Sequence, residues 1–246
     1  MNFAQIQKLP IAHTLDPIYT GNTVIGLRYK DGIIIACDTN LCYGSCLTKA
    51  ESYDKIKVLN NRTFIGYSGE FSDMQETNRI LDEMIQEDNL STNYNGNFGP
   101  IELGHYLSSL HYYQRNKMNP LLNAIVCGGI DFNGDIILYN IDSFGTLLKG
   151  DYFATHMGSY FSCAIFRNEY PKNYKDLTKE KALEIISKCF EVLFYRHKSA
   201  GDQIQYTIME KNGNMDPKIE SGKFKLKTKW NFDIYQIGRE QFYPLA

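Results

Sequence analysis

The patterned part of the chain begins with two apolar runs, residues 23–30 and 33–38. The dipeptide Asp31-Gly32 between them is typical of a two-residue hairpin turn, so the two runs predict a pair of antiparallel strands. The second run has apolar residues in succession and does not alternate. Both faces of that strand are therefore expected to be buried.

The remaining apolar positions predict further strands, where they alternate or form short runs, and helices, where they recur every three or four residues. The other expected strands are residues 55–59, 63–68, 121–130, 135–141, 144–149, 152–156 and 203–210, followed by a basic alternating stretch, Lys223–Lys229. Helices are expected from Ser72 to the polar loop 91–100, from that loop to Asn119-Pro120, over residues 159–169, and from Thr178 to about Arg196. Tight turns are expected at Asn60-Asn61 and Asn133-Gly134, and Ser72 with Gln75 is typical of a helix-capping box.

The order of elements is strands, two helices, strands, two helices, strands. Two mainly antiparallel sheets that face each other, with a helix pair outside each sheet, would cover every apolar face. The sequence therefore predicts an α+β fold, a four-layer α-β-β-α sandwich. A chain of 246 residues, 43% hydrophobic and without an interdomain linker, fits one such domain.

Composition narrows the range of partners. The net charge of −2 favours neither a nucleic acid nor an anionic membrane, and no run of about 18 apolar residues predicts a membrane span. The first ten residues lack the apolar region of a secretory signal. Six thinly spread cysteines indicate free thiols in a reducing compartment, and the spacing of Cys37, Cys42 and Cys46 matches no zinc pattern. No metal or organic cofactor is expected.

Six segments along the chain carry a resemblance to a known family. They are Tyr19–Val24, Tyr43–Ser45, Tyr67–Gln75, Lys117–Asn123, Val192–Arg196 and Thr228–Asp233. In their order and spacing they resemble the proteasome beta-type subunits over nearly the whole chain. Within the family they are most similar to the type-4 group, the non-catalytic members at the seventh position of the beta ring. The resemblance implies the fold of the N-terminal nucleophile hydrolases, which is the same four-layer sandwich.

The resemblance also implies partners and a setting. Members of this family assemble with other alpha and beta subunits into the twenty-eight-subunit, four-ring core of the 20S proteasome, where they contact ring neighbours and the opposite beta ring. The implied role is structural, in ubiquitin-dependent protein degradation, and the implied location is the cytoplasm and the nucleus. No nucleic acid or membrane is implied.

Catalytic members of the family use a terminal threonine that is freed by self-cleavage. Its α-amine acts as the base, and a lysine held by an aspartate supplies positive charge nearby. Counting back from Asp38, which matches the family aspartate, the nucleophile position falls on Asn22, and a carboxamide has no hydroxyl. Thr23 follows it, but a shift of one residue in a strand turns a side chain to the opposite face. Lys55 matches the family lysine if one extra residue is allowed.

The supporting positions of the family site also differ in this chain. The serine-bearing turn reads His156-Met157-Gly158, the Arg-Asp pair reads Arg196-His197, and the following serine falls on Ala200 or, with another gap, on Ser199. No catalytic residue is therefore expected. Asn22, Asp38 and Lys55 are vestigial positions, and Asp38 with Lys55 should form a buried structural ion pair.

The two ends of the chain are expected to lie outside the domain. By resemblance, residues 1–13 form a propeptide, Thr14 starts the mature chain, and the domain covers residues 14–237. Residues 238–246 would form an arm that reaches the opposite beta ring and is anchored by Phe242, Tyr243 and Leu245, although a frayed terminus would also fit.

Other functions fit the sequence less well. The chain could be an active threonine endopeptidase that uses Thr23 or Thr14. A histidine-based site would have to use His156 and His197, but no serine or cysteine nucleophile signature accompanies them. An alpha-type subunit would need an N-terminal helix, which residues 1–20 do not predict. The lysines at 223–229 could bind nucleic acid, but alternation on a strand with one solvated face explains them better.

Overall fold

The computed structural model describes residues 19–44, 47–50, 52–91, 98–213 and 215–227. The expected propeptide, with the start at Thr14, lies outside the described residues. So does the C-terminal arm with its anchors Phe242, Tyr243 and Leu245, and these expectations therefore stay predictions.

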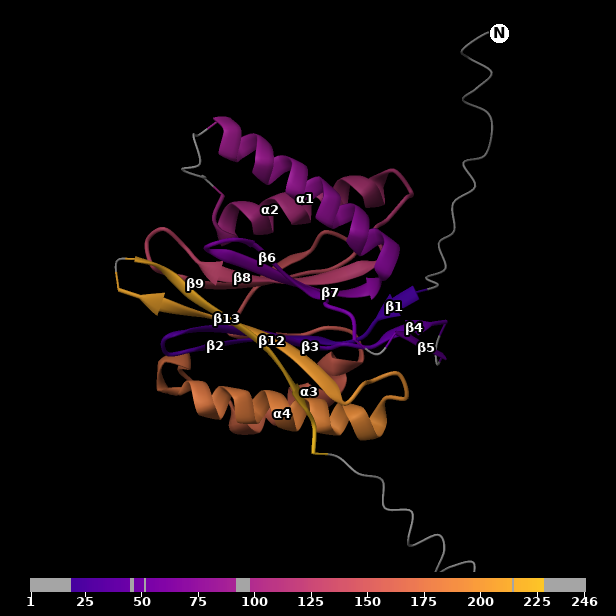
Figure 1. The fold of residues 1–246 in the computed structure, drawn as a ribbon, viewed down its shortest axis with the longest axis vertical. Helices are drawn as coiled ribbons and strands as arrows, with labels where there is room; N and C mark the ends of the chain where they lie inside the picture. The colour runs from indigo at the N-terminus through magenta and orange to yellow at the C-terminus, as the bar shows by residue number, and fades with distance from the viewer. Residues whose placement is uncertain (1–18, 45–46, 51, 92–97, 214, 228–246) are drawn as a thin grey trace, which may run out of the picture.

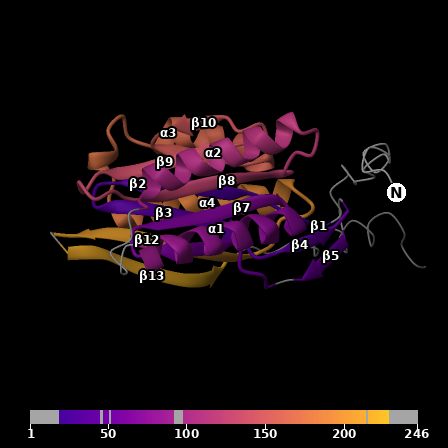
Figure 2. The ribbon, with the colours of Figure 1, turned by 90° about the horizontal axis from the view of Figure 1, so that it is seen from above.

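The larger of two sheets has eight antiparallel strands in the order β10-β9-β8-β7-β1-β4-β5, with β6 paired to β7 beside this path (Figure 1). Its strands are β1 (Tyr19–Gly21), β4 (Leu41–Tyr43), β5 (Leu47–Ala50), β6 (Ile56–Asn60), β7 (Thr63–Glu70), β8 (Asn123–Ile130), β9 (Ile136–Ile141) and β10 (Leu147–Lys149). The small strands β1, β4 and β5 lie together at one end of the molecule (Figures 1 and 2).

The smaller sheet has five antiparallel strands in the order β11-β2-β3-β12-β13. They are β2 (Val24–Tyr29), β3 (Gly32–Asp38), β11 (Tyr152–Ala154), β12 (Gln203–Asn212) and β13 (Met215–Lys225). The central strand β3 is buried on both faces, as predicted. Ile34 and Ala36 pack in the core under the helices of this sheet, whereas Ile33 and Ile35 pack against the larger sheet.

Two helices cover the outer face of each sheet (Figure 1). Helices α1 (Phe71–Ser91) and α2 (Pro100–Asn116) lie on the larger sheet, and α3 (Met157–Glu169) and α4 (Lys179–Arg196) lie on the smaller one. A short 3-10 helix, η2 (Tyr174–Asp176), precedes α4. One apolar core lies between the sheets and one under each helix pair, so the predicted α-β-β-α sandwich is confirmed. None of the described helices is both long and apolar enough to cross a membrane.

The first hairpin turn lies one residue earlier than its sequence indicates. Tyr29 pairs with Gly32, so the turn consists of Lys30 and Asp31, and Gly32 is already the first residue of β3. Gly32 does not adopt a positive φ. A Cβ at Gly32 would lie 2.1 Å from the carbonyl oxygen of Met209 in β12. Glycine is required here by a neighbouring strand and not by the turn.

Two other local expectations are also wrong in detail. The pairing of Asn60 with Thr63 moves the second turn by one residue, from Asn60-Asn61 to Asn61-Arg62. Helix α1 begins at Phe71, so Ser72 lies inside its first turn and is not the N-cap residue. The Ser72 hydroxyl donates instead to Glu70 Oε1 at 3.0 Å, because a Glu side chain lies within reach just before the helix.

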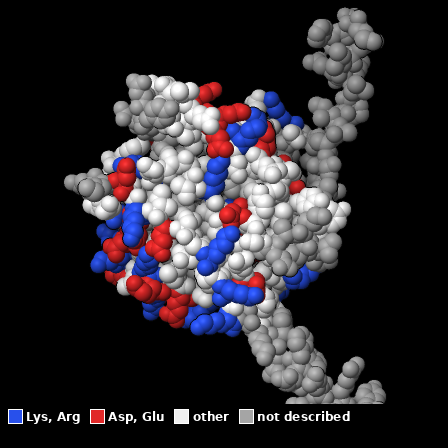
Figure 3. Space-filling view, in the orientation of Figure 1, with Lys and Arg blue, Asp and Glu red and all other residues white. Residues whose placement is uncertain are grey.

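The lysines of β13 belong to a mixed surface. Lys223 pairs with Asp54 at 2.6 Å, and Lys225 pairs with Asp202 at 3.0 Å. On the face shown in Figure 3, acidic and basic side chains lie side by side and do not separate by sign. This arrangement favours the solvated-strand interpretation of these lysines over a nucleic-acid surface.

Candidate functional site

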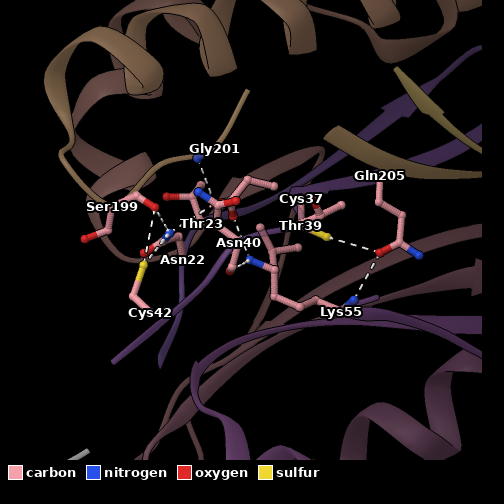
Figure 4. Close-up of polar contacts among 12 residues, drawn as sticks. Asn22, Thr23, Cys37, Thr39, Asn40, Cys42, Lys55, Ser199, Gly201 and Gln205 are labelled. Atoms are coloured by element: carbon pink, nitrogen blue, oxygen red, sulfur yellow. Dashed lines mark hydrogen bonds and ion pairs between the residues drawn. The ribbon is translucent and has the colours of Figure 1, made fainter. Parts of the chain in front are cut away.

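The candidate site lies where the chain crosses between the two sheets. Asn22 and Thr23 link β1 of the larger sheet to β2 of the smaller one. Asp38 is the last residue of β3, and Lys55 comes directly before β6. Because β3 and β6 belong to different sheets, side chains from both meet at this junction (Figure 4).

Asp38 and Lys55 form the predicted buried ion pair. Lys55 Nζ lies 2.7 Å from Asp38 Oδ1, and the two side chains are 1% and 2% exposed. The ammonium group also donates to the backbone carbonyl of Asn40 at 3.0 Å. A pair so far from water is stable only when further hydrogen bonds satisfy both charged groups.

Asn22 supplies one of these further hydrogen bonds. Its Nδ2 donates to Asp38 Oδ2 at 3.0 Å and also to the carbonyl oxygen of Ser199. Both neighbours are acceptors, so they fix the amide with its nitrogen toward Asp38. The backbone N–H of Gly201 donates to the same carboxylate oxygen at 3.2 Å. The Asp38 carboxylate therefore accepts one ionic and two neutral hydrogen bonds.

This arrangement can hold the two sheets together through the Asn22 carboxamide and the ion pair. Both N–H groups of the Asn22 carboxamide are engaged, and the group carries no hydroxyl. Strand β1, which precedes Asn22, pairs with both β4 and β7. Residue 22 therefore follows directly on a strand that is paired on both sides.

Thr23 belongs to a different set of contacts. Its Oγ1 accepts the backbone N–H of Gly158 at 3.0 Å, in the first turn of α3. A Cβ at Gly158 would lie 2.1 Å from Thr23 Cγ2, so glycine permits this close approach. Asn22 contacts Asp38 while Thr23 contacts the start of α3, in agreement with the expected reversal of neighbouring side chains.

The structure places the other positions that the resemblance assigns to the family site in differing surroundings. Met157 is the first residue of α3 and is 38% exposed. His156 precedes it in the left-handed region with φ +49°. Ser199 is buried and contributes its backbone carbonyl to Asn22. Ala200 lines a surface hollow of about 450 Å³ beside the site.

Sequence reasoning missed the backbone groups that complete the site. The carbonyls of Asn40 and Ser199 and the N–H of Gly201 are present in any residue type, so their roles leave no side-chain signal. Gly201 is the one of these residues whose type is constrained by the structure, because a Cβ there would lie 2.6 Å from the side chain of Asn40. Cys42 was also missed as a contact, and its thiol lies 3.6 Å from the Ser199 carbonyl.

A thiol next to the ion pair is also buried and hydrogen-bonded. Cys37 donates to Gln205 Oε1 at 3.6 Å, and the same oxygen accepts the backbone N–H of Lys55 at 3.0 Å. Burial raises the pKa of the Cys37 thiol to about 12, so it stays neutral. Among the residues that the structure describes, no group of three or more His, Cys, Asp or Glu side chains converges to hold a metal ion.

Comparisons with known proteins identify the family. The proteasome subunit family model matches residues 18–209. Proteasome subunit beta type-4 of Arabidopsis thaliana is 35% identical over 222 residues, 90% of this chain and 86% of the relative. The beta type-4 subunit of Xenopus laevis is 32% identical and covers 83% of each chain. The beta type-7 subunit of Saccharomyces cerevisiae is 30% identical over 94% of this chain and 89% of its own. This chain belongs to the proteasome subunit family.

Proposed function

We propose that this chain is a non-catalytic beta-type subunit that builds the beta ring and the ring–ring interface of the 20S proteasome core. The observation that carries the proposal is the bonding of Asn22. The resemblance assigns this residue to the family's nucleophile position, and its carboxamide has no hydroxyl and uses both N–H groups to bind Asp38 and Ser199. In this proposal the subunit positions catalytic neighbours, closes the chamber and performs no peptide hydrolysis itself.

The buried pair gives this structural role a physical basis. Asp38 and Lys55 connect strands of different sheets, and three further hydrogen bonds, from Asn22 and Gly201 to Asp38 and from Lys55 to Asn40, surround them. A rigid junction of this kind keeps the sandwich fixed while its outer faces contact other subunits. We propose the type-4 group as its place in the family, and ubiquitin-dependent proteolysis in the cytoplasm and nucleus as its setting.

An active endopeptidase is the second candidate, and the geometry gives it no support. Before Thr23 could act as a terminal nucleophile, the chain would have to be cleaved after Asn22, in the segment that follows β1. The hydrogen bond of Thr23 to Gly158 would also have to break. Thr14, the other candidate nucleophile, lies outside the described residues.

Isolation of the particle tests the structural role. The full-length chain, tagged at one end and expressed in its own cells, is expected to co-purify with alpha and beta proteasome subunits in a fixed ratio. The intact mass of the recovered subunit is expected to correspond to a start at Thr14. Recovery of the chain alone, in particle-free fractions, would contradict the proposal.

A further inference from the structure

Four large apolar side chains are exposed on the last turns of helix α2, just after it, and on the β9–β10 turn that packs against it. We call Tyr112, Tyr113, Met118 and Phe144 the aromatic patch; their exposed fractions are 53%, 55%, 79% and 59%. Single exposed apolar side chains are ordinary on protein surfaces, but a group of them indicates a binding surface. None of these side chains belongs to the three cores of the fold.

Contacts between the helix and the turn make the aromatic patch one surface. The hydroxyl of Ser108 in α2 donates to the carbonyl oxygen of Gly145 at 2.6 Å. The guanidinium of Arg115 lies 5.9 Å from the centre of the Tyr112 ring and 5.6 Å from that of Phe144. Arg115 thus contacts both segments. Its guanidinium lies near the rings of Tyr112 and Phe144, which are far apart in the sequence.

The aromatic patch carries positive charge that no carboxylate of the described residues balances. Lys117 Nζ lies 4.1 Å above the Tyr113 ring. Neither Arg115 nor Lys117 forms an ion pair with any described residue, whereas Lys179 and Lys188 each pair with two carboxylates. The acidic residue of the turn, Asp142, accepts the backbone N–H groups of Phe144 and Thr146 through Oδ1 and so holds the turn itself.

The surface is also held in shape before any partner binds. Gly145 has φ +84°, and a Cβ there would lie 2.7 Å from both Ser108 O and Tyr112 N. The turn therefore lies directly against the backbone of α2. A preorganised surface loses little conformational entropy on binding, and Tyr, Phe, Met and Arg are the residue types enriched at protein interfaces.

We propose that the aromatic patch is a docking surface for a neighbouring subunit that presents carboxylates to Arg115 and Lys117. The inference rests on the proposed function, because it needs a subunit assembly. Charge complementarity decides the kind of occupant. An acidic partner would pair with both cations while its apolar atoms cover the rings. A second copy of this chain would bring two more unpaired cations to the same interface.

Site-directed photo-cross-linking in the intact particle tests the inference. A photoreactive phenylalanine analogue at position 113 is expected to capture one other subunit, at a peptide that contains Asp or Glu. The same analogue at position 160, where Tyr160 is exposed on α3, should not capture that peptide. The double variant Arg115→Glu/Lys117→Glu should lower the yield from position 113 about tenfold, or exclude the chain from particles.

A matched charge reversal serves as the control. Lys172 and Lys175 are also exposed and form no ion pair with described residues, so Lys172→Glu/Lys175→Glu makes the same change of charge elsewhere. This variant should enter particles and cross-link from position 113 as the unmodified chain does. An equal loss in both double variants would show that net charge matters and the aromatic patch does not.

The inference and the proposed function fail in different ways. Suppose that the chain is in the particle. The docking surface is wrong, and the structural role stands, if position 113 captures no peptide at all. The same holds if it captures a second copy of this chain or the chain's own residues 228–246. If the chain is absent from particles, both are wrong.

Discussion

Asn22 shows how one side chain can connect separate segments at a buried site. A threonine hydroxyl carries one hydrogen and could donate to a single acceptor, whereas the carboxamide donates to both Asp38 and the Ser199 carbonyl. The carboxamide of Asn22 therefore connects the end of β3 to the segment after α4.

Removing the side chain of Asn22 should weaken the fold. Asn22→Ala leaves the buried Ser199 carbonyl without this donor and takes one of three donors from Asp38, so the free energy of unfolding is expected to fall by about 1–3 kcal/mol. Asn22→Asp should cost more, because it places a second carboxylate against Asp38. Urea denaturation of the full-length chain measures both. An Asn22→Asp variant as stable as the unmodified chain would contradict this geometry.

Breaking the ion pair from one side should cost more than removing both charges. Lys55→Met leaves the Asp38 carboxylate buried without its counter-ion and is expected to lower the free energy of unfolding by about 3–5 kcal/mol. The double variant Asp38→Asn/Lys55→Met removes both charges and should recover much of that loss. A double-mutant cycle by urea denaturation measures the coupling. Additive effects of the two single substitutions would argue against the pair.

His111 should make stability depend on pH. It is fully buried in α2, its Nε2 lies 3.0 Å from Asn123 Oδ1, and burial lowers its pKa from 6.5 to about 4. Between these values the unfolded chain binds a proton that the folded chain does not. The free energy of unfolding should therefore be unaffected by His111 above pH 6.5 and fall by up to about 3 kcal/mol as pH decreases to 4.

The variant His111→Gln isolates this contribution. Because glutamine does not titrate, the difference in unfolding free energy between the unmodified chain and the variant should shrink across the window from pH 6.5 to 4. Urea midpoints measured at several pH values provide the comparison. Parallel pH profiles for the two chains would mean that His111 does not bind the proton.

At the scale of elements, the contact between α3 and the segment that links β1 to β2 depends on the missing side chain of Gly158. Gly158→Ala would place a Cβ 2.1 Å from Thr23 Cγ2 and force the start of α3 away from the sheet. Overpacking of this kind is expected to lower the melting temperature and to cost about 1–3 kcal/mol. Thr23→Ser removes that methyl group and keeps the hydroxyl, so the double variant should be more stable than Gly158→Ala alone. Equal melting temperatures would count against the contact.

Element order could be predicted from the sequence, whereas the ends of elements could not. Helix and strand periodicities follow from local patterning, and the buried run in β3 showed that both of its faces are covered. The position of Gly32 is set by the carbonyl of Met209, which is 177 residues away. Such tertiary contacts leave no local pattern, and for this reason the first turn was misplaced by one residue.

The candidate site was predictable in the same partial way. Asn22, Asp38 and Lys55 could be found because side-chain identity at matched spacing marks them, and the structure brings all three together. The Ser199 carbonyl and the Gly201 N–H could not be found, because backbone groups look alike in every sequence. Only the fold brings them to the site.

At the scale of the whole molecule, the structure combines a four-layer sandwich with a buried polar junction. The described residues form two sheets, two helix pairs and three cores, and membership of the proteasome subunit family rests on most of the chain. The buried network at Asp38 stabilises the crossing between the sheets. The aromatic patch lies on an outer surface, at the end of α2, where an assembly could use it.

Labelling of intact particles with an electrophile that reacts with terminal threonines tests the central claim, that this chain is not a peptidase. Mass spectrometry of every subunit after labelling reports where the probe has bound. We expect adducts on catalytic sister subunits and none on this chain, because Asn22 has no hydroxyl and Thr23 is bound to Gly158. A covalent adduct on Thr23 or Thr14 of this chain, at a yield similar to that of its sisters, would contradict the account.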